Sequence, residues 1–253
     1  MKRRFLLISM GLCVSAIFFL SRSSMDSPRD DPEFVYARLR YHMTLEGLEM
    51  RELPWHHDYP FSDEVFPSVL AEITNIRSSR SAYNIVDIDS PEIFKYPFAY
   101  LSEPGFINLT AKDVVNLREW LDRGGFLLVD DMRTSAYSRY TGGFEDDIGH
   151  FRAEMKKVYP DRELVRLELS DPVFNTFYKI QSLEMRAPYI FPGQGPAEFL
   201  GLRDSNGNLM MVVNNNNDLS EFWEWLDRGE MSMHDATTSF HFGINDVLYA
   251  MTH

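Results

Sequence analysis

The chain has 253 residues, of which 44% are hydrophobic and 14% aromatic, so it can bury the core of one domain and is not of disordered composition. Its formal net charge is −13, and an acidic surface repels phosphate backbones, which argues against a nucleic-acid partner. The single cysteine, Cys13, lies in an N-terminal apolar run, which excludes disulfides, a thiol nucleophile and a cysteine-ligated metal site from the rest of the chain.

Residues 1–23 have the pattern of a targeting segment. Three basic residues at positions 2–4 precede an apolar run over residues 5–20. This run is short for a free membrane span and long for a minimal signal peptide, so a cleaved signal peptide and an uncleaved membrane anchor both remain open. In either case the basic flank predicts that the body of the chain is exported, to the periplasm or another extracytoplasmic location, with membrane contact through residues 5–20 if they are not cleaved. The alternative is that this apolar run forms a buried helix of a cytosolic protein.

The polar, proline-containing residues 24–33 predict a linker, and residues 34–253 predict a single α/β domain. A first strand is expected over residues 34–41. The loop after it contains His56, His57 and Asp58. A metal needs ligands that converge, whereas adjacent histidines on an extended loop point apart, so the pattern favours a solvated loop that covers the strand ends.

A helix with apolar positions from 66 to 76 follows, with Ser62 or Asp63 as its expected N-cap. Next come a strand over residues 84–88 and a short helical turn that begins at Pro91.

Residues 96–131 read as a strand–helix–strand unit around which the domain is organised. Residues 98–102 and 126–129 are continuous apolar runs, typical of strands covered on both faces. Thr110 with Asp113 resembles a capping box at the start of the intervening helix, and a glycine pair ends it. Such a unit predicts parallel strands with a right-handed crossover.

Acidic side chains follow both strands of this unit. Glu103, Asp130 and Asp131 emerge at the carboxyl ends, where ligands bind in open parallel sheets. Because consecutive strand residues face opposite sides, only one of the two aspartates can face a ligand. Capping of loop amides and contact with a ligand or Mg²⁺ both remain open for this pair. Arg133 could bind an anion, but pairing with Asp130 or Asp131 is favoured.

The C-terminal half continues with a helix over residues 151–158, a strand over 164–169 and an irregular loop. Strands over residues 199–203 and 209–213 flank an Asn-Gly pair, which predicts an antiparallel hairpin added to the sheet. An amphipathic helix over residues 240–251 closes the chain. The predicted fold is therefore α/β, a mostly parallel sheet between helix layers with this hairpin near the C-terminus.

A run of four asparagines from Asn214 is followed by Asp218 at the end of the last strand. Asparagine suits turns, which is the stronger interpretation. The run could also present amides to sugar hydroxyls, with Trp223 or Trp225 as a stacking surface.

Motifs of known enzymes are missing from the sequence. There is no serine elbow, no phosphate-binding glycine loop and no HExxH pattern. The sequence therefore leans against catalysis and predicts no cofactor, although a divalent metal at Asp130 and Asp131 remains an alternative.

Several stretches together resemble the uncharacterised bacterial family called "domain of unknown function 4159". They are YPFAYLSEPG, LREWLDRGGFLLVDD, FRAEMKKVYPDRELVRLELSDPVFNTFY, NNDLSEFWE and FGINDVLYAMTH. The resemblance implies an exported or membrane-associated domain with a flavodoxin-like three-layer fold, akin to class I glutamine amidotransferases. It does not carry over their activity, which needs a catalytic cysteine that this body lacks.

These observations predict ligand or protein binding without catalysis in a crevice at the carboxyl ends of the strands. One alternative is an envelope hydrolase that uses a carboxylate base or a divalent metal in the same crevice, and another is a scaffold in a membrane complex. The partner would be a small molecule or an envelope protein. The candidate binding residues are His56, His57, Asp58, Glu103, Asp130, Asp131, Arg133, Asn214, Asp218 and Trp223.

Overall fold

The computed structural model describes residues 31–43, 53–133, 146–190 and 193–253. Residues 32–253 form one compact unit that holds the helices and strands described below. The predictions for residues 1–23 lie outside the described residues. Among the described helices, none combines the length and the apolar character needed to cross a membrane.

Seven strands of the described chain form one sheet in the order β2-β1-β3-β4-β7-β6-β5. Their bounds are Tyr36–Arg40 (β1), Tyr83–Asp87 (β2), Phe98–Ser102 (β3), Phe126–Met132 (β4), Val165–Arg166 (β5), Glu198–Arg203 (β6) and Leu209–Asn215 (β7). Neighbours from β2 to β7 pair in parallel, whereas β6 pairs antiparallel with both β7 and β5. Counted along the chain, the five parallel strands have the order 2-1-3-4-5, one of the two common doubly wound orders.

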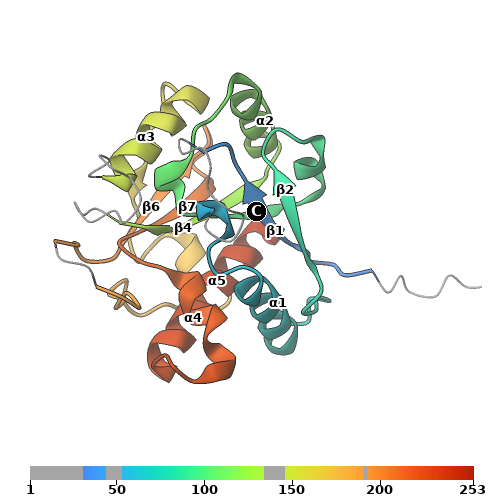
Figure 1. Cartoon of the computed structure of the whole chain (residues 1–253), viewed down its shortest axis with the longest axis vertical. Helices are drawn as coiled ribbons and strands as arrows, with labels where there is room; N and C mark the ends of the chain where they lie inside the picture. Colours follow the sequence, from blue (N-terminus) through green and yellow to red (C-terminus); the bar gives the residue numbers. More distant parts are fainter. Residues whose placement is uncertain (1–30, 44–52, 134–145, 191–192) are drawn as a thin grey trace, which may run out of the picture. The chain divides into compact units, whose positions relative to one another are not determined.

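Helices cover both faces of the sheet (Figure 1). The α-helices are Phe61–Ile73 (α1), Ala111–Asp122 (α2), Asp147–Val158 (α3), Leu219–Glu224 (α4) and Met233–Thr252 (α5), and the short 3₁₀ helices are Pro54–His56 (η2), Pro91–Lys95 (η3), Pro104–Phe106 (η4), Pro172–Asn175 (η5) and Leu226–Arg228 (η6). Alternate residues of β3 enter two separate cores. Ala99 and Leu101 pack with α2 and α3, whereas Phe98 and Tyr100 pack with α1, α4 and α5. The predicted mostly parallel α/β fold with an antiparallel hairpin is confirmed, and kinship with flavodoxin or amidotransferases stays a prediction.

The local signals in the central unit act as predicted. Thr110 and Asp113 form a reciprocal capping box, in which Thr110 N donates to Asp113 Oδ2 at 2.8 Å. Gly124 has a φ of 97°, the left-handed conformation that commonly follows a helix end. A Cβ on Gly125 would lie 2.3 Å from the Trp120 ring, so this position needs glycine for close packing of helix and strand.

Two element predictions need correction. Neither Ser62 nor Asp63 caps α1, because both lie inside its first turn and bind Arg38 instead. The strand predicted over residues 164–169 has only two paired residues, Val165 and Arg166. The predicted hairpin joins the parallel strands through β7, which pairs in parallel with β4.

Candidate functional site

Charged side chains converge at the carboxyl ends of β3, β4 and β7 and on the loop that precedes α1. This strand-end cluster comprises His57, Asp58, Glu103, Asp131, Arg133, Asp218 and Glu221. Ligand atoms of His57, Asp58, Asp218 and Glu221 all lie within 4.8 Å of one another, and so do those of His57, Glu103 and Asp131. The cluster lies where doubly wound sheets bind ligands, beyond the strand ends.

His57 links the two groups of acids. Its Nδ1 lies 3.0 Å from Asp58 Oδ1 and 3.1 Å from Asp131 Oδ2, while 42% of its side chain remains exposed. Burial alone would lower the pKa of His57, but the charges and hydrogen bonds of Asp131 and Asp58 raise it far above its usual value. The imidazole is therefore a cation at neutral pH, held through Nδ1.

The backbone of this region is unusual. Every described non-glycine residue with a positive φ lies in the cluster or beside it, namely Asp58 (62°), Glu103 (44°), Asp131 (55°) and Asn216 (56°). Asp and Asn tolerate the left-handed region, but for Glu103 it is a costly conformation. Such strain persists where surrounding structure enforces it, and it concentrates at functional sites.

Asp131 and Asp218 are nearly inaccessible to solvent. Arg133 Nη1 lies 2.7 Å from Asp131 Oδ1, and its Nη2 lies 3.7 Å from Asp218 Oδ2. Apart from these ion pairs and the one with His57, neither Asp131 oxygen nor Asp218 Oδ2 has a well-oriented hydrogen-bond donor among the described residues. Buried carboxylate oxygens normally have such donors.

The electrostatics of the cluster are dominated by crowded acids. Burial and the charge of Asp131 raise the pKa of Glu103 to about 8 and that of Asp218 well above its usual value. Burial and the charge of Asp58 raise the pKa of Glu221 to about 7. For Asp131 itself burial works in the same direction, but the Arg133 and His57 cations hold its pKa below the usual range.

Asp130 faces away from the cluster and has a structural role. Its Oδ2 accepts hydrogen bonds from the main-chain N–H groups of Leu219 (2.8 Å) and Ser220 (3.1 Å), and its Oδ1 accepts one from Asn214 Nδ2 (3.3 Å). Burial, with the nearby charge of Asp131, raises its pKa to about 7. Of the two open alternatives, capping therefore describes Asp130, while Asp131 faces the cluster.

Comparison with models of known protein families identifies the family of this chain. The family described as "Domain of unknown function (DUF4159)" matches residues 36–251. The chain belongs to this family. None of the curated proteins compared with the chain matches it. The matched region of this DUF4159 chain contains all the residues of the strand-end cluster.

Some of the remaining predicted residues take part in the cluster and others do not. Arg133 pairs with Asp131, as favoured from the sequence. Trp223 is fully buried, with its ring 4.3 Å from that of Phe66, so its predicted use as a stacking surface is wrong. His56 packs its ring 4.8 Å from Tyr59 and takes no part in the cluster. The solvated-loop interpretation of residues 56–58 is wrong for His57 and Asp58, which do converge on Asp131.

Two residues that sequence reasoning missed hold the cluster in place. Arg38 is fully buried in β1, pairs with Asp63, and donates to the carbonyl oxygen of His57 at 2.9 Å. Ser220 accepts a hydrogen bond from Tyr100 Oη at 2.6 Å and donates one to Asp58. Arg38 lies between the apolar residues Ala37 and Leu39 of β1, and this position was a signal in the sequence, because buried arginines are rare unless paired.

Proposed function

We propose that the strand-end cluster of this DUF4159 domain binds a divalent cation. The observation that carries the proposal is a set of three buried carboxylate oxygens within converging acids. Both oxygens of Asp131 and Oδ2 of Asp218 meet only the ion pairs with His57 and Arg133 and accept no well-oriented hydrogen bond among the described residues. Oxygens that share a cation at 2.0–2.6 Å must lie within roughly 5 Å of one another. The ligand atoms satisfy this condition within each of two groups that share His57, one with Asp58, Asp218 and Glu221 and the other with Glu103 and Asp131.

Charge supports the same conclusion. Five carboxyl groups of the cluster surround only two cationic side chains, His57 and Arg133. Without a metal, burial and then this repulsion favour the protonated carboxyl groups, so the pKa values of Glu103 and Glu221 are raised. A cation that replaces these protons should bind more tightly as the pH rises from 6 to 8. Because His57 is a cation in this arrangement, the ligands are carboxylate oxygens, which suit Mg²⁺, Ca²⁺ and Mn²⁺ better than Zn²⁺.

A thermal-shift series tests the proposal. The full chain would be unfolded with each of these four ions, beside Asp131→Asn, Asp218→Asn and Asp161→Asn, an exposed control outside the cluster. An ion at 100 times its dissociation constant stabilises the folded state by about 2.7 kcal/mol. We expect a shift in the wild type and in Asp161→Asn, larger at pH 8 than at pH 6, and none in the two cluster variants. No shift with any ion, or an equal shift in Asp131→Asn, would overturn the proposal.

The contact of His57 with Asp131 favours a second candidate function, an envelope hydrolase. A bound cation would lower the pKa of a water ligand, and the exposed imidazolium could donate a proton to the leaving group. Turnover of chromogenic ester and phosphodiester substrates that needs Mn²⁺ and is lost in His57→Asn would support this function. Cation binding without any turnover of envelope material or these substrates would leave binding as the function.

We also infer that the domain is exported. The basic residues 2–4 and the apolar run over residues 5–20 support this location. Export places the cluster in a compartment where an envelope ligand or protein can reach it.

A further inference from the structure

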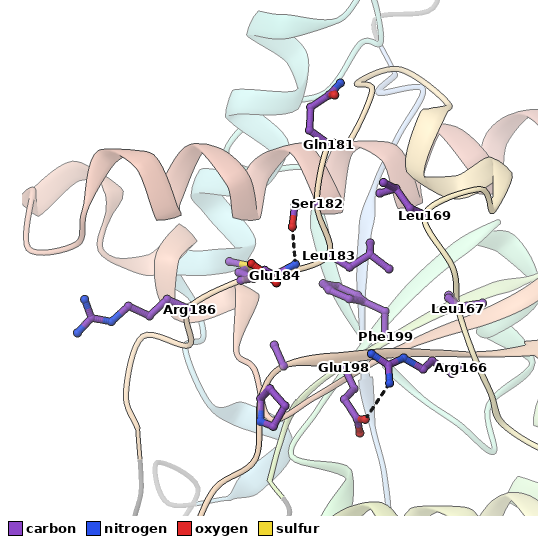
Figure 2. Close-up of a pocket in the computed structure, with 13 residues that line it drawn as sticks. Arg166, Leu167, Leu169, Gln181, Ser182, Leu183, Glu184, Arg186, Glu198 and Phe199 are labelled. Carbon is purple, nitrogen blue, oxygen red and sulfur yellow. Dashed lines mark hydrogen bonds and ion pairs between the residues drawn. The ribbon is translucent and has the colours of Figure 1, made fainter.

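A second candidate site lies at the antiparallel edge of the sheet, away from the strand-end cluster. A groove of about 770 Å³ lies between the segment 181–186 and the strands β5 and β6 (Figure 2). We call it the edge groove, and the side chains used below are those of Arg166, Leu169, Leu183, Glu184, Glu198 and Phe199. Its volume is that of a small-molecule or short-peptide site.

The floor of the edge groove is apolar. Figure 2 shows the side chains of Leu183 and Phe199 close together in its centre, with that of Leu169 at its edge. Phe199 belongs to the core and is only 2% exposed, whereas Leu169 is 43% exposed. A floor of this kind gains free energy by covering exposed aliphatic surface, about 25 cal/mol per Å² buried. An aliphatic side chain is the matching group.

The wall formed by residues 181–187 offers unpaired main chain. Within the described chain, these residues make no backbone–backbone hydrogen bond. Among the described residues, the only hydrogen bond that their main-chain N–H groups donate is from Glu184 N to Ser182 Oγ, at 3.0 Å. Main-chain groups of this kind beside a groove are what an extended peptide pairs with when it adds a strand.

The charges of the edge groove select among ligands. Arg166 lies 3.9 Å from Glu198 at one end, and Figure 2 shows Arg186 directed away from the other side chains. Glu184 has no ion-pair partner among the described residues. Because Arg166 pairs with Glu198 and Arg186 is directed away, the charge that remains in the groove is that of Glu184, which opposes phosphate and fatty-acid ligands. The nearly inaccessible Phe199 ring cannot serve as a platform for a sugar.

We propose that the edge groove binds an extended peptide of a partner protein that carries an aliphatic residue next to a basic one. The aliphatic side chain covers the floor formed by Leu169, Leu183 and Phe199. The basic side chain pairs with Glu184, and the peptide main chain pairs with residues 183–186. This site does not depend on the cation proposed for the strand-end cluster.

Selection of random linear heptapeptides on the full chain, followed by fluorescence anisotropy of labelled synthetic peptides, tests this proposal. We expect selected peptides to contain an aliphatic–basic pair. Their affinity should fall at least tenfold in Leu169→Asp, an exposed position that tolerates the change. The control Val115→Asp, at a 65% exposed position of α2, and Asp131→Asn should retain wild-type affinity.

A charge exchange sharpens the test. Glu184→Lys should weaken the selected peptides by at least fivefold, and peptides with glutamate in place of their basic residue should regain affinity for this variant alone. N-methylation of alternate peptide amides should also weaken binding, because it removes the main-chain donors. Failure to select peptides, or selected peptides that bind Leu169→Asp as tightly as the wild type, would overturn the proposal.

Discussion

Replacing Glu103 with glutamine removes a half-buried carboxyl group whose pKa burial and the charge of Asp131 raise to about 8. In the unfolded chain the same group has a pKa of about 4.3. At a pH between these two pKa values, Glu103 keeps its proton in the folded state and has released it in the unfolded state. A raised carboxyl pKa therefore contributes stability that is complete below about pH 4.3 and is lost as the pH rises towards 8.

The size of the effect follows from this linkage. One proton changes the free energy of unfolding by at most about 1.4 kcal/mol per pH unit, so the limit between pH 5.5 and 7.5 is about 2.7 kcal/mol. Partial exposure of Glu103 and its coupling to Asp131 reduce the expected difference to about 1–2 kcal/mol. Other raised pKa values, such as those of His57 and Glu221, act in the same direction and are present in both proteins.

Urea unfolding in metal-free buffer at pH 5.5, 6.5 and 7.5 measures the effect. The free energy of unfolding of the wild type should fall with rising pH, and that of Glu103→Gln should fall by about 1–2 kcal/mol less. Glu163→Gln, whose side chain is 65% exposed, should follow the wild type. A wild type that gains stability over this range, or parallel curves for wild type and Glu103→Gln, would refute the reasoning.

Three further predictions concern the scaffold and the location. Arg38→Met leaves the Asp63 carboxylate buried without its partner and should lower the free energy of unfolding by about 3–5 kcal/mol. Adding Asp63→Leu should restore most of this free energy, as measured by urea unfolding. A double variant as unstable as the single one would contradict this prediction. Asp130→Asn should lower the free energy of unfolding by about 1–3 kcal/mol, because an amide replaces the carboxylate that accepts from two main-chain N–H groups. The variant should keep the thermal shift induced by the cation, and loss of that shift in a folded variant would count against a purely structural role of Asp130. Alkaline phosphatase fused to the C-terminus should be active in a bacterial host and inactive after deletion of residues 2–20, and activity that survives the deletion would contradict export.

Local signals explain why most of the fold could be predicted. The apolar run of β3 is bounded by polar residues, and the helix after it carries its own capping box and terminal glycine. These features act over a few residues and are read directly from the sequence. The parallel partner of β7 depends instead on residues some 80 positions away, such as Val129 opposite Val213, so the sequence predicted the hairpin but not the strand to which it is joined.

The site was predictable only in part. The strand-end rule located Glu103, Asp131 and Asp218, because strand ends follow from the apolar pattern. His57 was a candidate on a loop expected to cover the strand ends, but its contact with Asp131 could not be predicted, because the loop is held by hydrogen bonds from Arg38 to the loop backbone. The burial of Trp223 likewise depends on tertiary packing against Phe66, which no local pattern indicates.

The most direct test of the cation site is anomalous diffraction from crystals of the full chain grown with Mn²⁺. We predict an anomalous peak about 2.0–2.6 Å from carboxylate oxygens of Asp131 and Asp218, and no such peak in Asp131→Asn crystals grown under the same conditions. A peak only elsewhere on the molecule, or no peak beside these carboxylates at saturating Mn²⁺, would contradict the proposal that the strand-end cluster binds a cation.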